Sequence, residues 1–193
     1  MVDAGYDIVA IASSAGGITA LTDLVPQLLA DLPASIVIVQ HLDPRHRSVI
    51  DEILSRRTAL RVRQVAEGMQ LAPATIYVAP PAFHTLVAAD HRLHLNQAEL
   101  VHFVRPSADL LFESVAATFK DRAIGVVLTG TGNDGAMGVR AIDKMGGTVI
   151  VQADPEFSGM PNAARNTGGV DFVLPIAEVG IAINRLVCPE PGE

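Results

Sequence analysis

The stretch YDIVAIASSAGG, from Tyr6 to Gly17, decides the fold class of this chain. Its first seven residues form a short apolar run that is typical of a buried strand, and the small residues after it indicate a tight turn. Beyond the turn, apolar side chains recur at helical spacing, at Ile18, Leu21, Leu24, Val25, Leu28 and Leu29. A short strand, a glycine-bearing turn and an amphipathic helix predict the first β-α unit of a parallel sheet.

Similar units follow along the rest of the chain. A second buried strand is predicted at Ser35 to Gln40, after Pro33, and the strongest strand signal is AIGVVLT, from Ala123 to Thr129. Alternating residues from Phe83 to Leu95 indicate an antiparallel hairpin. We expect further strands at 61–66, 75–79 and 147–152, and helices at 46–58, 107–120 (with Ser107 as N-cap), within 130–145, at 159–168 and at 176–186. The order predicts an α/β fold, a mostly parallel doubly wound sheet with helices on both faces and one antiparallel hairpin, as one domain over residues 1–193.

The composition excludes several classes of protein. Of the 193 residues 49% are apolar and 18% are charged, which excludes a disordered chain, and the absence of Trp predicts an aliphatic core. A net charge of −7 disfavours nucleic acid as the main partner. No apolar run reaches the ~18–20 residues that cross a bilayer, and the N-terminus lacks a signal-peptide pattern. Because Cys188 is the single cysteine, no intrachain disulfide can form. We therefore expect a cytoplasmic protein without membrane insertion.

Reactive side chains follow three of the predicted strands. The first strand leads to Ser13 and Ser14, the second leads to His41, and the strand at 123–129 leads through a glycine-rich loop to Asp134. Because sites of open parallel sheets form at the carboxyl ends of the strands, these side chains should converge. A hydroxyl nucleophile, an imidazole base and a carboxylate that orients the base are the parts of a serine hydrolase.

The pattern alone leaves an alternative open. A glycine turn with serines also serves as a phosphate cradle, so a nucleotide- or phosphate-binding module is a second interpretation. The first turn contains neither G-x-G-x-x-G nor a Gly-Lys-Ser/Thr signature, and this interpretation gives His41 and Asp134 no role. Against the hydrolase, the order Ser, His, Asp differs from the common hydrolase orders and G-x-S-x-G is absent.

Six segments of the chain occur together in one order. They are IASSAGG (11–17), IVQHLDP (38–44), YVAPPAFH (77–84), RPSADLLFESVA (105–116), VLTGTGNDGAMG (127–138) and SGMPNAA (158–164). In this order they resemble the catalytic domain of the chemotaxis methylesterase family, the protein-glutamate methylesterases that demethylate chemoreceptors and often also deamidate receptor glutamines. The resemblance covers about residues 7–183.

The resemblance implies roles for individual residues. The nucleophilic serine of the family stands two residues before the Gly-Gly pair, which selects Ser14 over Ser13. The family histidine follows Val-Gln of the second strand, as His41 does, and the family aspartate lies in a Gly-x-Gly-Asn-Asp-Gly loop, as Asp134 does. Ser14 would attack the γ-carbonyl of a glutamate methyl ester while His41 relays the proton. Methanol leaves, water releases the carboxylate, and no cofactor is implied.

Two side chains near the predicted nucleophile depart from the family pattern. Ala15 stands where the family has Thr, and Thr131 stands where it has Met. Backbone N–H groups near these two residues are candidates for the oxyanion hole. The departures leave one alternative within the same fold, a catalytically weak or silent scaffold that binds receptors.

The length of the chain bears on partners and regulation. Family members commonly carry an N-terminal phosphoacceptor receiver domain, whereas here the first strand is predicted within a few residues of Met1. We therefore expect a catalytic domain with no attached receiver domain, as a stand-alone or an excised unit. The expected partners are the cytoplasmic helices of methylated chemoreceptors.

Other polar residues carry weaker predictions. By the resemblance, Arg105 contributes to the substrate-facing surface, with packing of its stem as the alternative. Six of the twelve arginines lie between Arg45 and Arg63, which suggests a basic rim that steers Glu-rich receptor helices toward His41. His84 is expected to be a plain loop histidine. A metal site is not expected at His91, His94 and His102.

Overall fold

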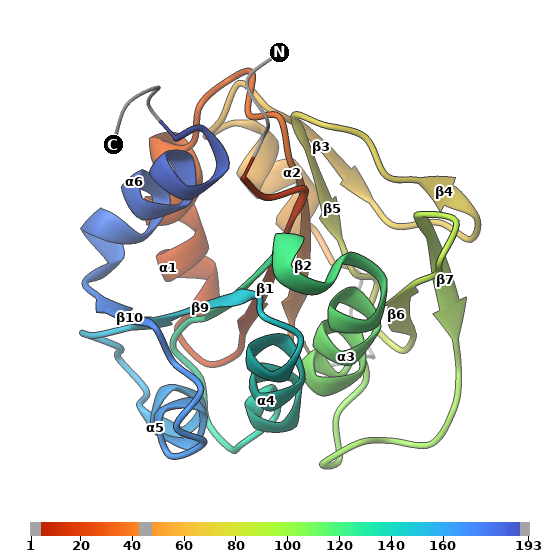
Figure 1. Cartoon of the computed structure of the whole chain (residues 1–193). Helices are drawn as coiled ribbons and strands as arrows, with labels where there is room; N and C mark the ends of the chain where they lie inside the picture. Colours follow the sequence, from red (N-terminus) through yellow and green to blue (C-terminus); the bar gives the residue numbers. More distant parts are fainter. Residues whose placement is uncertain (1–4, 43–47, 190–193) are drawn as a thin grey trace.

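A seven-stranded parallel sheet forms the centre of the computed structural model, which describes residues 5–42 and 48–189 (Figure 1). Its spatial order is β10-β9-β8-β1-β2-β5-β3. The strands are β1 (Ile8–Ser13), β2 (Ser35–Gln40), β3 (Arg61–Gln64), β5 (Thr75–Val78), β8 (Ala123–Val127), β9 (Thr148–Gln152) and β10 (Phe172–Leu174). The opening run of the sequence is therefore the central strand, paired with β2 on one side and β8 on the other.

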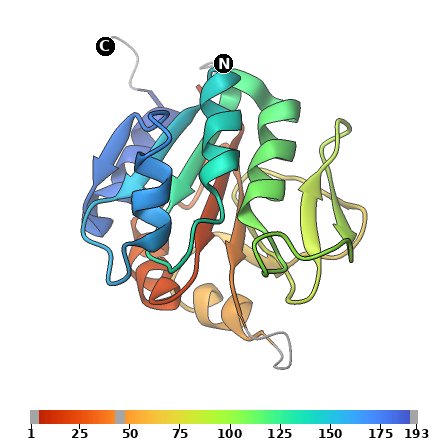
Figure 2. The same cartoon turned by 90° about the horizontal axis from the view of Figure 1, so that it is seen from below.

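Helices cover both faces of this sheet, as predicted. One face carries α1 (Gly17–Leu24), α2 (Ile50–Ser55) and α6 (Ile176–Val187), and the other carries α3 (Ala108–Phe119), α4 (Ala136–Lys144) and α5 (Gly159–Arg165), which lie in front of the sheet in Figure 2. A hydrophobic core lies on each face of the sheet. Successive residues of β1 pack into one core and then the other, because side chains alternate along a strand. Val9 and Ile11 pack with α1, whereas Ala10 and Ala12 belong to the core under α3.

The predicted hairpin is also confirmed. It consists of β6 (His84–Val87) and β7 (Arg92–Asn96), which pair antiparallel. A third strand, β4 (Met69–Gln70), pairs with β7 and completes a separate three-stranded sheet. The sequence did not predict β4 or β10, since two and three residues are too few to show a period.

Several predicted helices are shorter in the structure, among them the one predicted at 159–168, which is α5 and ends at Arg165. The pattern from Ile18 to Leu29 predicted one helix, but α1 ends at Leu24 and continues only as a 3₁₀ turn at Val25–Gln27. Pro26 explains the change, because proline has no N–H for the next α-helical hydrogen bond. The helix predicted at 46–58 is α2, at Ile50–Ser55, and the first two residues of the prediction lie outside the described residues. Within residues 5–42 and 48–189, no helix has the length and apolar character that a membrane span requires.

The pair α3 and α4 packs closely at Gly138. A Cβ added at Gly138 would overlap the Cβ of Phe112, and the Phe112 side chain is fully buried between α3 and the sheet. This glycine therefore allows the close approach of the two helices, whose N-termini form part of the candidate site described below.

We expect Gly138→Ala to lower the free energy of unfolding by about 1–3 kcal/mol, because the added methyl group forces Phe112 out of place. A loss of stability would be informative, because replacing glycine by alanine inside a helix normally raises the free energy of unfolding by ~1 kcal/mol. Urea unfolding followed by circular dichroism measures the change. Equal or greater stability of the variant would contradict the close contact.

Candidate active site

Ser14 lies in the turn between β1 and α1, at the point where the sheet topology switches direction. The crevice outside the strand ends at such a point is the usual ligand site of open α/β sheets. The Ser14 N–H donates to the Thr129 carbonyl at 3.0 Å, and the Gly17 N–H donates to the Ser14 carbonyl at 2.8 Å. The side chain of Ser14 is half-buried, whereas Ser13 is fully buried and its hydroxyl donates to Gln40 Oε1 at 2.7 Å. Ser14 is thus the more accessible of the two hydroxyls.

His41 directly follows β2 and occupies the strand position next to Ser14. In the β1–β2 register Ser13 pairs with Gln40, and the His41 N–H donates to the Ser13 carbonyl at 3.0 Å. Ser14 and His41 therefore follow neighbouring strand ends, as the sequence predicted. Among the described residues, no hydrogen bond joins the Ser14 hydroxyl to the imidazole of His41.

Asp134 binds the imidazole of His41 directly. The distance from His41 Nε2 to Asp134 Oδ2 is 2.8 Å, with 10% of the His41 side chain and 3% of the Asp134 side chain exposed. Asp134 precedes α4, but its carboxylate reaches the N-terminus of α3, where the N–H groups of Ala108 and Asp109 donate to it at 2.6 and 3.1 Å. The Ser107 hydroxyl donates to Oδ1 at 2.8 Å. The carboxylate therefore accepts four hydrogen bonds.

These contacts fix the charge of Asp134 and the tautomer of His41. Burial alone would raise the pKa of Asp134, but the hydrogen bonds from His41, Ala108 and Asp109 outweigh burial, and the pKa lies below its ordinary value. An ionised carboxylate accepts hydrogen bonds only, so Nε2 of His41 carries a proton. In the neutral ring Nδ1 is then the nitrogen that can accept a proton.

Gln40 connects the two strand ends that carry Ser14 and His41. Its Nε2 donates to the carbonyls of Ser14 and His41 at 2.8 and 2.9 Å, while its Oε1 accepts from the Ser13 hydroxyl. The residue is buried. This role of Gln40 was not predicted, although a polar residue at the end of the apolar strand SIVIVQ, just before the predicted base, is a usable signal.

The loop after β8 packs against Ser14. A Cβ added at Gly130 would stand 2.8 Å from the Cβ of Ser14, so only glycine fits there. Thr131 follows in this loop and is exposed. The Thr129 hydroxyl donates to the Ala15 carbonyl at 3.1 Å. The structure thus brings the segments of both oxyanion candidates, Ala15 and Thr131, beside Ser14.

His84 is not the plain loop histidine that the sequence suggested. It begins β6 and is fully buried. Its Nδ1 accepts from the Ser107 N–H at 3.1 Å, and its Nε2 contacts the Glu99 carbonyl at 3.0 Å. Ser107 is the N-cap of α3, as predicted. His84 therefore holds the helix N-terminus that binds Asp134.

A cavity of about 160 Å³ opens beside His41. Its lining includes His41 and Leu42, which follow β2, and Leu100, Phe103, Val104 and Arg105, which precede α3. Arg105 Nη1 donates to the carbonyls of Gln97 and Ala98 at 3.1 and 2.7 Å. Arg105 thus lies in the lining of the cavity beside His41.

The other three histidines considered for a metal have separate partners. His91 stacks on Phe119 with 4.6 Å between ring centroids, His94 Nδ1 lies 2.6 Å from Glu67, and His102 Nε2 lies 3.2 Å from Asp109. Across residues 5–42 and 48–189, no three or more His, Cys, Asp or Glu side chains gather as a metal site would require.

Four of the six arginines of the hypothesised basic rim, Arg56, Arg57, Arg61 and Arg63, lie among the described residues. Arg45 and Arg47 lie outside the described residues. Arg56 caps the end of α2, and Arg61 pairs with Thr75, the first residue of β5. Arg61 therefore lies at the amino-terminal edge of the parallel sheet, away from His41, and the rim stays a hypothesis.

Asp134→Asn tests the network around the carboxylate. The amide of the variant would present an N–H₂ group to donors that now meet an oxygen. We therefore expect the free energy of unfolding to fall by about 2–4 kcal/mol at neutral pH. Because the pKa of Asp134 is lowered in the folded protein, its charge stabilises the fold above the ordinary value of 3.8. That contribution disappears as the pH falls through the lowered pKa. The difference in the free energy of unfolding between wild type and variant, measured by urea unfolding, should therefore narrow below about pH 4.

Asp90→Asn is the matched control, because Asp90 is 60% exposed on the hairpin. We expect it to change stability by less than ~0.5 kcal/mol at either pH. If the difference in the free energy of unfolding between wild type and Asp134→Asn stayed constant with pH, the lowered pKa of Asp134 would be contradicted.

Comparisons with known proteins show the family to which this chain belongs. A family model described as CheB methylesterase matches residues 9–183. The protein-glutamate methylesterase/protein-glutamine glutaminase of Symbiobacterium thermophilum is 38% identical over 182 residues, which are 93% of this chain and 50% of that protein. A putative protein-glutamate methylesterase/protein-glutamine glutaminase of Leptospira interrogans is 36% identical over 94% of this chain and 95% of its own length. The chain thus spans half of the first relative and nearly all of the second.

A solved structure gives the same result for the fold. The crystal structure of the Thermotoga maritima CheB methylesterase catalytic domain aligns with a TM-score of 0.90 and 32% sequence identity. The alignment covers 94% of this chain and 99% of that one. The family model matches most of this chain, and the Leptospira interrogans relative is matched over 95% of its own length, so the chain belongs to the CheB methylesterase family.

Proposed function

We propose that this chain is a protein-glutamate methylesterase that hydrolyses glutamate γ-methyl esters on chemoreceptors to glutamate and methanol. The observation that carries the proposal is the 2.8 Å contact between His41 and the buried Asp134, beside the accessible Ser14, in a chain of the CheB methylesterase family. The names of its relatives support both the substrate and the reaction. The partners are the cytoplasmic helices of the receptors, which places the chain in the cytoplasm.

The proposed reaction proceeds through a covalent intermediate. Ser14 Oγ attacks the ester carbonyl and gives its proton to Nδ1 of His41, because Asp134 occupies Nε2. The tetrahedral intermediate collapses, the bond to the methoxy oxygen breaks, and His41 protonates that oxygen, so methanol leaves. Water then attacks the acyl-serine with His41 as the base, which releases the glutamate and restores the Ser14 hydroxyl.

The negative oxygen of the intermediates needs N–H donors. We assign this role to the backbone near Ala15 and Thr131, which the contacts with Thr129 and Gly130 keep beside Ser14. The N-terminus of α1 adds the positive end of a helix dipole. Arg105 then belongs to the surface that faces the substrate.

The same residues could act on a receptor glutamine, as the second half of the relatives' names suggests. An amide carbonyl replaces the ester carbonyl, and ammonia leaves in place of methanol. The product is glutamate in both reactions. The alternative is a receptor-binding scaffold of the same fold with little or no activity, which Ala15 and Thr131 keep open. Release of methanol by the wild type would exclude the scaffold.

Ser14→Ala should reduce methanol release from methyl-labelled receptor membranes by at least about 10³-fold, because the attacking oxygen is removed. Ser13→Ala is the matched control, since Ser13 is buried and bonds only within the fold. We expect it to keep activity within about tenfold of wild type. No release by wild type would refute the esterase, and release that survives Ser14→Ala would refute the nucleophile.

Gln40→Met tests the clamp between the two strand ends. Without the amide, the carbonyls of Ser14 and His41 lose their shared donor, and we expect kcat to fall about 10- to 100-fold with a smaller change in KM. Gln27→Met is the control, because Gln27 Nε2 also donates to two carbonyls, those of Asp23 and Ile176, and its Oε1 accepts from Gly180. It joins α1 to α6 and should affect stability alone. Equal kcat losses in both variants would show that Gln40 acts only on stability.

A further inference from the structure

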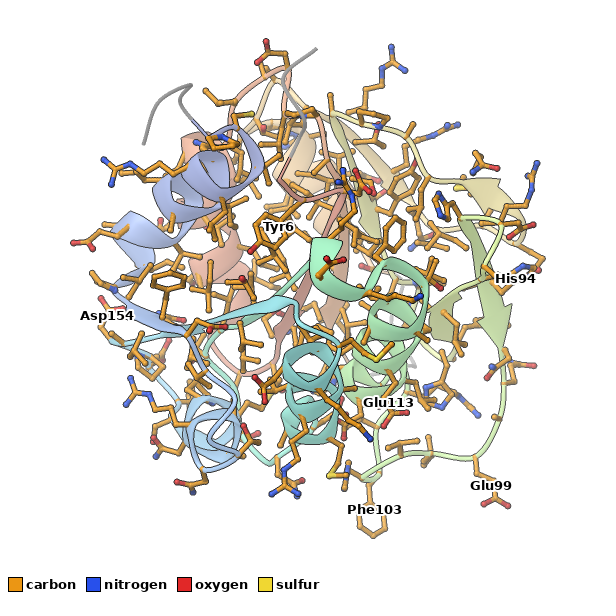
Figure 3. The ribbon with its side chains drawn as sticks, viewed as in Figure 1. Tyr6, His94, Glu99, Phe103, Glu113 and Asp154 are labelled. Atoms are coloured by element: carbon orange, nitrogen blue, oxygen red, sulfur yellow. The ribbon has the colours of Figure 1, made fainter. Side chains whose placement is uncertain are left out.

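Phe103 is exposed to an unusual degree for a large apolar side chain. Its relative exposure is 95%, and in Figure 3 its ring points away from the rest of the molecule. Leu100, three residues earlier, is 53% exposed. Isolated exposed apolar residues are common, but both of these line the cavity beside His41. Their position at the candidate site calls for a functional explanation.

The backbone at Phe103 has a conformation that its sequence does not favour. Two hydrogen bonds close the turn, from the Val101 N–H to the Val104 carbonyl at 3.2 Å and from the Val104 N–H to the Val101 carbonyl at 2.9 Å. The two central residues, His102 and Phe103, have φ values of 48° and 64°. This left-handed region is normally occupied by Asn or Gly in such turns, and a bulky residue there is strained.

Contacts on both sides hold the strained turn in place. His102 Nε2 lies 3.2 Å from the carboxylate of Asp109, which is buried at the N-terminus of α3. Arg105 donates to the carbonyls of Gln97 and Ala98. Strained residues that the surrounding structure holds in place are concentrated at functional sites and ligand clamps. The contacts of His102 and Arg105 therefore fix the backbone that exposes the Phe103 ring to solvent.

The turn is also continuous with the proposed catalytic residues. The cavity has His41 and Leu42 on the side of β2, and Leu100, Phe103 and Val104 before α3. A substrate that places its ester at Ser14 and His41 extends its neighbouring side chains over this surface. Since the surface is mainly apolar, it suits a protein segment with apolar side chains next to the esterified glutamate.

We propose that Phe103 is the anchor that selects the receptor helix, by packing against apolar side chains one or two helical turns from the esterified glutamate. The inference rests on the proposed function. Aromatic anchors dominate binding in protein interfaces, and an anchor on a held turn loses little freedom on binding. Phe103 thus determines specificity for a protein substrate and has no part in the ester chemistry itself.

Phe103→Gly separates binding from stability. Glycine prefers the left-handed conformation, so the variant should fold at least as stably as wild type while it lacks the ring. With a soluble methyl-labelled receptor fragment as substrate, we expect KM to rise about tenfold or more and kcat to change less than twofold. With a small substrate, the γ-methyl ester of an N-acetylated glutamate amide, kcat/KM should stay within about twofold of wild type. Phe103→Leu, which keeps an apolar side chain, should recover most of the receptor affinity.

Phe172→Gly is the matched control, because Phe172 is 43% exposed on β10, at one edge of the sheet. It should leave KM unchanged for both substrates. An equal loss on both substrates in Phe103→Gly, or no loss on either, would overturn the proposal. An effect that appears only with membrane-embedded receptor and not with the soluble fragment would point to the lipid surface and would also overturn it. If wild type hydrolyses neither substrate, the esterase proposal fails instead.

Discussion

A single buried carboxylate, that of Asp134, connects the candidate site to the packing of the fold. Burying a charged carboxylate costs several kcal/mol unless donors replace the lost water. Here four donors do so, two of them N–H groups in the first turn of α3, where the helix dipole also favours a negative charge. The orientation of His41 therefore depends on where α3 begins. Any change that moves α3 against the sheet also moves the proposed base.

Asp109 forms the second half of this arrangement. Asp134, just before α4, binds the N-terminus of α3, and Asp109, in the first turn of α3, accepts from the Gly138 N–H in the first turn of α4 at 2.8 Å. The two carboxylates respond differently to similar burial. Burial would raise the pKa of Asp134, but the hydrogen bonds from His41, Ala108 and Asp109 outweigh it and lower the pKa, whereas burial and the nearby charge of Asp134 raise the pKa of Asp109. Asp109 also contacts His102, so the same helix N-terminus supports both the His41–Asp134 pair and the turn that carries Phe103.

The sequence was sufficient for six of the seven strands of the large sheet and for placing Ser14, His41 and Asp134 at one edge of it, because buried parallel strands are apolar runs and their carboxyl ends meet at one edge. It was insufficient where contacts distant in sequence decide the structure. Nothing near His84 predicts its bond to Ser107, and the His-Phe pair at 102–103 has none of the Asn or Gly that marks such a turn. The clamp by Gln40 depends on strand register, which single-sequence patterns do not specify.

Ala15 and Thr131, the two departures that the resemblance implies, change the side chains that shape the site more than the backbone donors beside it. If the oxyanion is bound by backbone N–H groups, replacing the side chains at Ala15 and Thr131 removes none of them. The position of the Ala15 segment is maintained from the other side, since the Thr129 hydroxyl donates to the Ala15 carbonyl. The loop that contains Thr131 depends on Gly130 against Ser14 and on Gly159, where a Cβ would stand 2.8 Å from the Gly132 nitrogen. Both contacts require the absence of a side chain at a glycine, and neither involves the side chain of Thr131. The changed side chains therefore bear on which substrates fit, while the proposed chemistry depends on groups that this chain retains.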